Sequence, residues 1–94
     1  MVDAQTIVTC LTLSNKRGLH ARAAAKFVAV VDQFNADIKV QKDGHVVGGS
    51  SIMGLLMLAM PCGDSFSLQA SGDEARAAVE ALETLIAERF GEPE

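Results

Sequence analysis

The hydrophobic period of this sequence changes within residues 14–20. Over residues 7–13, Ile, Thr and Leu alternate with Val, Cys and Thr, the period of a strand with one buried face. Further along, Ala24, Phe27, Val28 and Val31 recur at the spacing of one helix face. The sequence therefore predicts a strand-to-helix turn over residues 14–19, with His20 at the beginning of the helix.

The rest of the chain alternates between the same two periods. Two short alternating stretches flank the Asp43-Gly44 pair, which is typical of a tight hairpin turn. Ser71 and Glu74 match a capping box, and Gly91 is a helix stop signal. The expected elements are a hairpin over 36–49, a short helix over 52–59, a strand over 65–70 and a final helix ending near 89. This order predicts an α+β open-faced sandwich, with helices on one face of an antiparallel or mixed sheet.

The beginning of the first helix carries the chain's most reactive arrangement. Unpaired backbone N–H groups and the helix dipole make a helix start an anion site. With His20 as the cap residue, Nδ1 could bring a phosphate to the amides of Ala21 and Arg22, and the Arg22 guanidinium suits phosphate oxygens. Gly18 permits a turn conformation closed to other residues. Because a neutral imidazole keeps a lone pair for attack, we interpret His20 as a phosphoryl acceptor, although such a turn could be only a connection.

Two segments resemble one known family. Asn-Lys-Arg-Gly-Leu-His-Ala-Arg-Ala-Ala-Ala-Lys-Phe-Val at 15–28 is similar to the active-site segment of the HPr family, the histidine phosphocarriers of the bacterial phosphoenolpyruvate phosphotransferase system. Ser-Ile-Met-Gly-Leu-Leu at 51–56 resembles a second family segment at the family's distance, and the likeness runs from about Val8 to Phe90. It implies a four-stranded antiparallel sheet in the order 1-4-2-3. Ala23 departs from the family's common proline, which we expect to loosen the turn slightly without removing the site.

The resemblance also implies partners. Phospho-enzyme I would donate the phosphoryl group to His20 and an enzyme IIA domain would accept it, each docking in turn on the same surface. Such a relay suits transient contacts made by a monomer. The sequence contains no recognisable nucleotide-binding loop, metal-ligand cluster or second acid or base beside His20. We therefore expect a stoichiometric carrier that is not an enzyme and needs no cofactor.

The second segment carries a regulatory and a docking hypothesis. Ser51 is expected to cap the short helix, and by resemblance it is a target of an HPr kinase/phosphorylase. The charge of a phosphate on Ser51 would disturb the docking of a partner on the adjacent residues. Ser50 is a weaker target because it lies one residue before the position that matches the family. The short helix has too many apolar residues for one buried stripe. We assign Ile52, Met53 and Leu56 to a partner-docking patch, where the resemblance places them beside the histidine.

Length and charge exclude several classes of protein. A chain of 94 residues has room for one core, so residues 1–94 are expected to form one HPr-like domain. The net charge of −4 and the absence of Tyr and Trp argue against a nucleic-acid partner. The apolar run at 52–60 is too short to cross a bilayer. Asp3 and Gln5 stand where a signal peptide would be basic, so a cytoplasmic location is expected.

Other hypotheses stay open. A regulatory adaptor of the same fold could bind targets through the docking patch alone, although the intact His20-Ala-Arg22 argues against a purely non-phosphorylated role. A small RNA- or metabolite-binding domain would share the element order. His45 has no cysteine or carboxylate cluster beside it, so no metal site is expected. Cys10 and Cys62 do not make a disulfide framework. The sequence does not separate a sugar branch from a nitrogen-regulatory branch of the pathway.

Overall fold

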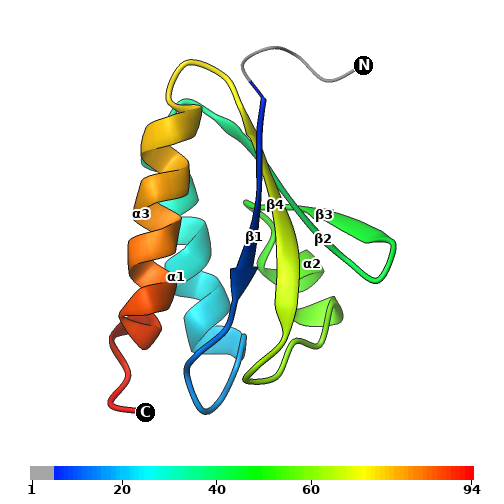
Figure 1. The fold of residues 1–94 in the computed structure, drawn as a ribbon, viewed down its shortest axis with the longest axis vertical. Coiled ribbons are helices and arrows are strands. Elements are labelled where there is room, and N and C mark those ends of the chain that lie inside the picture. The colour runs from blue at the N-terminus through cyan, green and yellow to red at the C-terminus, as the bar shows by residue number, and fades with distance from the viewer. Residues whose placement is uncertain (1–5) are drawn as a thin grey trace.

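The computed structural model describes residues 6–94 (Figure 1). The lead-in expected at 1–5, with Asp3 and Gln5, lies outside the described residues. The elements are β1 (Ile7–Thr12), α1 (Ala21–Val31), β2 (Asp37–Lys42), β3 (His45–Gly48), α2 (Ile52–Met57), β4 (Ser65–Ser71), α3 (Ala75–Ala87) and the short 3-10 turn η1 (Arg89–Gly91). This succession confirms the predicted order, although α2 and α3 each end two residues earlier than expected.

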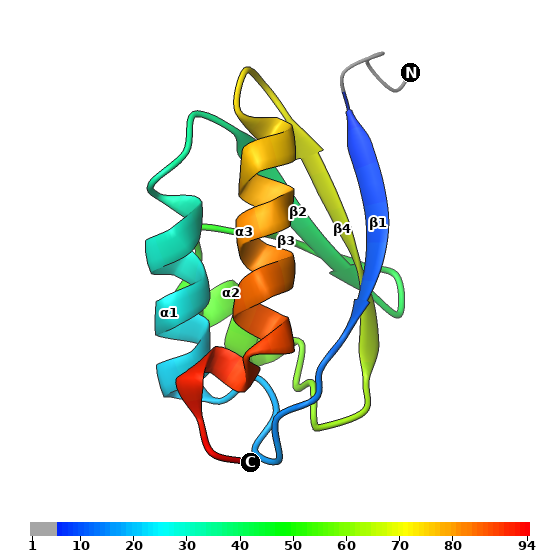
Figure 2. The ribbon, with the colours of Figure 1, turned by 60° about the vertical axis from the view of Figure 1, so that its left-hand side comes forward.

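The four strands form one sheet in the order β1-β4-β2-β3, and every neighbouring pair is antiparallel. In Figures 1 and 2, α1 and α3 lie side by side across one face of this sheet, and α2 lies on the same side near β3. The structure therefore confirms the predicted α+β open-faced sandwich and the strand order that the resemblance implied.

The core fills the space between the sheet and the helices. Val40 and Leu68 of the sheet and Phe27 and Leu82 of the helices are at most 1% exposed. On β4, buried residues alternate with half-buried ones, as expected for a strand that faces a helical layer on one side. This packing fixes α1 on the sheet and so fixes the position of its first turn.

The β2–β3 turn folds as predicted. Asp43 and Gly44 both adopt positive φ angles, 52° and 82°, as a two-residue type I′ hairpin loop requires. His45, which follows the turn, is exposed.

The predicted capping box is wrong. Ser71 is the last residue of β4 and pairs with Asp37, so it cannot cap a helix. Glu74 is at the cap position of α3 but makes no side-chain capping bond. Its Oε1 instead accepts a hydrogen bond from the backbone N–H of Asn35 at 2.7 Å, and its own N–H donates to the Asn35 carbonyl at 3.0 Å. Glu74 therefore ties the beginning of α3 to the loop that follows α1.

Across residues 6–94, the structure contains no helix with the length and apolarity needed to cross a bilayer. Cys10 and Cys62 are exposed free thiols. The two cysteines therefore do not contribute a cross-link to the fold.

Candidate functional site

The turn between β1 and α1 is held by backbone hydrogen bonds. The Gly18 N–H donates to the Asn15 carbonyl at 3.1 Å, and the His20 N–H donates to the Gly18 carbonyl at 3.0 Å. The Leu19 N–H donates to the Met60 carbonyl at 2.9 Å, and the Leu19 side chain is buried. These contacts fix the turn against the segment that follows α2 and therefore restrain the backbone position of His20.

His20 is the N-cap residue of α1, as predicted. Its backbone is extended, and its carbonyl accepts the first helical hydrogen bond from the Ala24 N–H at 2.8 Å. The His20 side chain makes no capping hydrogen bond, so its ring does not use the amides of the first turn. Ala21 and Arg22, the residues that follow it, are both exposed, whereas Ala23 is fully buried. The helix start can therefore receive an anion from solvent.

Asn15 is a residue of the candidate site that no local sequence pattern indicated. Its side chain is fully buried, and its Nδ2 donates both to the Gly18 carbonyl at 2.7 Å and to Glu92 Oε1 at 3.1 Å. One amide group therefore closes the turn and also holds the end of the chain.

Replacing Asn15 by alanine should lower the free energy of unfolding by about 1–3 kcal/mol, because the buried Gly18 carbonyl keeps only the His20 N–H as a donor and the hydrogen bond to Glu92 is lost. Urea denaturation measures this change. Asn35→Ala is the matched control, because that side chain is exposed and its one amide contact, to Asp73, is 3.5 Å long. An equal loss in both variants would contradict the structural role of Asn15.

The segment after α3 brings a carboxylate to the histidine. Arg89 and Phe90 both have a φ of 56°, so the chain reverses its direction there. The Phe90 side chain is buried, and its carbonyl accepts a hydrogen bond from Lys26 Nζ at 2.6 Å. Beyond this anchor, Glu92 Oε2 and His20 Nε2 form a close hydrogen bond. The sequence had indicated only a helix stop in this region.

Glu92 is ionised at neutral pH. The hydrogen bond with His20 lowers the pKa of the Glu92 carboxyl below its ordinary value; partial burial opposes this shift, and Asn15 and the charge of Arg17 add to it. An ionised carboxylate only accepts hydrogen bonds. The hydrogen atom between the two groups therefore belongs to Nε2, and a neutral His20 ring has its lone pair on Nδ1.

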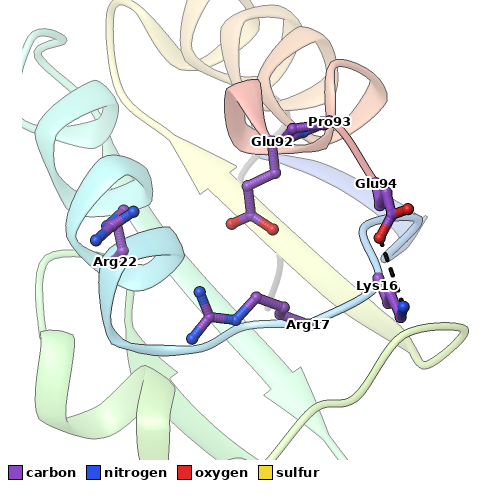
Figure 3. Close-up of a pocket in the computed structure, with 6 residues that line it drawn as sticks. All are labelled: Lys16, Arg17, Arg22, Glu92, Pro93 and Glu94. Carbon is purple, nitrogen blue, oxygen red and sulfur yellow. Dashed lines mark hydrogen bonds and ion pairs between the residues drawn. The ribbon is translucent and has the colours of Figure 1, made fainter.

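Basic side chains surround this carboxylate in an open pocket (Figure 3). The pocket is lined by Lys16, Arg17, Arg22, Glu92, Pro93 and Glu94. Figure 3 shows the Arg17 side chain lying along the turn below the Glu92 carboxylate, toward the side of Arg22, and Arg22 projecting from the first turn of α1. Of these cations, only Arg22 was predicted as a site residue.

The predicted docking residues lie on α2, which packs against α1. The Ser51 Oγ accepts a hydrogen bond from the Gly54 N–H at 2.9 Å, so Ser51 caps α2 as predicted. Ile52 and Met53 are 40% and 69% exposed, whereas Leu56 is half-buried against the core. Met57, which the sequence did not assign to the patch, is 79% exposed.

Residues 6–94 contain no group of three or more His, Cys, Asp or Glu side chains arranged to hold a metal ion.

Known proteins resemble this chain over most of its length. The family model for the "PTS HPr component phosphorylation site" matches residues 7–88. The phosphocarrier protein HPr of Cupriavidus necator is 43% identical over 83 residues, covering 88% of this chain and 93% of that protein. DhaM of Pantoea ananatis, a phosphoryl donor subunit of a PEP-dependent dihydroxyacetone kinase, is 39% identical over 96% of this chain but only 19% of its own length. The crystal structure of an HPr from Thermoanaerobacter tengcongensis matches with a TM-score of 0.89 at 40% identity, covering 94% of this chain and 99% of that one. The chain therefore belongs to the HPr family of phosphotransferase-system phosphocarriers.

Proposed function

We propose that His20 carries the phosphoryl group on Nδ1, receiving it from phospho-enzyme I and passing it to an enzyme IIA domain. The observation that carries this proposal is the position of His20 at the N-cap of α1, with Nε2 engaged by Glu92. This contact leaves the lone pair of the neutral ring on Nδ1. Family membership supports the donor and acceptor classes, since an HPr-family carrier works with enzymes of the phosphotransferase system.

The transfer needs positioning and charge more than further reactive groups. The Nδ1 lone pair attacks phosphorus, the Nδ1–P bond forms, and the bond to the donor breaks with its electron pair left on the donor. Arg22 and the backbone amides of Ala21 and Arg22 would bind the phosphoryl oxygens at the helix start. The second transfer reverses these events toward the acceptor. The chain therefore acts as a stoichiometric carrier without turnover of its own.

Partner docking is proposed on α2. Ile52 and Met53 are exposed apolar side chains, and Leu56 borders them while packing on the core. Exposed apolar side chains on a helix packed beside α1 suit a partner that must also reach His20. Brief contact through such a small surface fits a monomer that exchanges partners.

The test is to incubate the full chain with phosphoenolpyruvate and a cognate enzyme I and to measure its intact mass. We expect the mass to increase by one phosphate. In separate samples, acid treatment should remove this phosphate, and addition of an enzyme IIA domain should remove it too. Absence of any gain with an active enzyme I would refute the carrier proposal for His20. In that case the exposed residues of α2 would favour the adaptor hypothesis.

We also propose Ser51 as a regulatory phosphorylation site. The residue is exposed, and the exposed Ile52 and Met53 follow it directly. Close to two added negative charges there would oppose docking of an apolar or acidic partner surface. An HPr kinase/phosphorylase is the proposed modifying enzyme, and slower transfer from enzyme I to the Ser51-phosphorylated chain would be the expected effect.

Ser51→Ala should lower the free energy of unfolding by about 1 kcal/mol, because α2 loses its cap. Urea denaturation would measure the loss. The neighbouring Ser50→Ala is the matched control: its hydroxyl contacts only an exposed carboxylate of Asp32 at 3.1 Å, so a change below about 0.5 kcal/mol is expected. Equal losses would contradict the capping role.

A further inference from the structure

We propose that Glu92 is a positioning residue for His20: it holds the ring by Nε2–H and balances the positive charge that the ring gains when Nδ1 binds phosphorus. This inference rests on the proposed function of His20. Glu92 lies 72 positions after His20 in the sequence, beyond the helix stop at Gly91.

The contact is built into the fold at several points. Glu92 Oε1 accepts from the buried Asn15 amide at 3.1 Å, which leaves Oε2 for His20. The backbone that leads to Glu92 is also held in place. The Phe90 ring is buried, and the Phe90 carbonyl accepts a hydrogen bond from Lys26 Nζ. The side chains of His20 and Glu92 are only 17% and 14% exposed. Two anchored, mostly buried groups form a contact with little orientational freedom, unlike a surface ion pair.

The reaction explains what such a contact would do. In the neutral ring with hydrogen on Nε2, attack by Nδ1 on phosphorus leaves Nε2–H in place and makes the ring cationic. A carboxylate beside Nε2 stabilises this charge more than it stabilises the neutral ring, so it favours the transition state over the ground state. When the acceptor takes the phosphoryl group, the electron pair returns to Nδ1. No proton has to enter or leave during either transfer.

The position of the carboxylate also separates two tasks. Glu92 contacts Nε2, whereas Arg22 lies in the first turn of α1, where the amides that would hold phosphate begin. The carboxylate can therefore remain on the ring while the phosphoryl group occupies the other nitrogen. A carboxylate located beside Nδ1 would instead have to move away before the phosphoryl group could bind there, which would slow the transfer.

The experiment compares wild type with Glu92→Ala, Glu92→Gln and the control Glu88→Ala, each as the full chain. Glu88 is exposed and does not line the pocket, and its replacement by alanine changes the net charge by the same amount. Phosphorylation by enzyme I is followed over a range of carrier concentrations. We expect Glu92→Ala to lower kcat about tenfold with KM nearly unchanged, and Glu88→Ala to match wild type. Glu92→Gln keeps one oxygen, which can accept from Nε2–H, but it lacks the charge and its NH2 group would face the Asn15 donor, so a smaller loss than in Glu92→Ala is expected.

A spectroscopic readout separates positioning from general stability. In ¹H–¹⁵N spectra, wild type, Glu88→Ala and Glu92→Gln should show a slowly exchanging Nε2–H of His20, which Glu92→Ala should lose. Equal rates in Glu92→Ala and wild type, a faster rate, or a change confined to KM would each refute the role of Glu92. A wild-type chain that accepts no phosphate would refute the proposed function itself, and the role of Glu92 with it.

Discussion

His20→Ala is expected to abolish the acid-labile phosphate that the wild-type chain gains from phosphoenolpyruvate and enzyme I. The reason is chemical, since alanine supplies no nitrogen lone pair. The side chains of the neighbouring pocket do not include another imidazole: they are two arginines, a lysine, a proline and two glutamates. Intact mass before and after acid treatment measures the effect, and a complete loss is expected.

His45→Ala is the matched control, because it removes the only other histidine and leaves the site untouched. His45 is exposed at the beginning of β3, so this variant should gain phosphate at the wild-type rate. Circular dichroism and thermal melting should show that both variants fold. An acid-labile phosphate on His20→Ala, or its loss from His45→Ala, would assign the acceptor elsewhere.

Gly18→Ala should destabilise the protein by about 3 kcal/mol or more and slow phosphorylation of the fraction that stays folded. Gly18 has a φ of 65°, and a Cβ there would lie 2.4 Å from the Met60 carbonyl oxygen and 2.7 Å from the Pro61 Cα. The carbonyl cannot move away freely, because it accepts the hydrogen bond from the Leu19 N–H. Relief of the overlap would pull the turn away from its support and shift the adjacent His20. Urea denaturation and the rate of phosphate gain measure the two effects.

Gly63→Ala separates backbone conformation from steric overlap. Gly63 also has a positive φ, 91°, but a Cβ there would meet nothing within 4 Å. Its replacement should therefore lower the free energy of unfolding by only about 1 kcal/mol. If both variants lose the same stability, the contact between the turn and the segment after α2 is not what constrains Gly18.

The order of elements could be predicted because each one has a clear period in the sequence. The strand order could not be derived this way, and only the family resemblance supplied it. The capping box failed for a specific reason: Ser71 pairs with Asp37 as the last residue of β4, so the strand continues through the position where the cap was expected. Local sequence cannot show that pairing with a distant strand will win over a helix cap.

The geometry of the candidate site was predictable only where it depends on neighbouring residues. His20, Arg22 and Ser51 lie at helix starts, and their positions follow from the chain around them. Asn15 and Glu92 are brought together by a contact across 77 residues of sequence, which no local pattern indicates. The sequence shows acidic residues at 92 and 94 and basic residues at 16 and 17, but not that they are neighbours in space. The left-handed turn at Arg89 and Phe90 brings these segments together.

The anchored end of the chain decides where this protein can be tethered. The Lys16 N–H donates to the Glu94 carbonyl at 3.0 Å, so a chain joined after Glu94 would leave the molecule at the rim of the pocket. An affinity tag or a fusion partner placed there would compete with an incoming protein for the space in front of His20. β1 begins at the opposite end of the sheet (Figure 1). Surface-immobilised binding assays should therefore attach the protein ahead of β1, which leaves the whole docking side open.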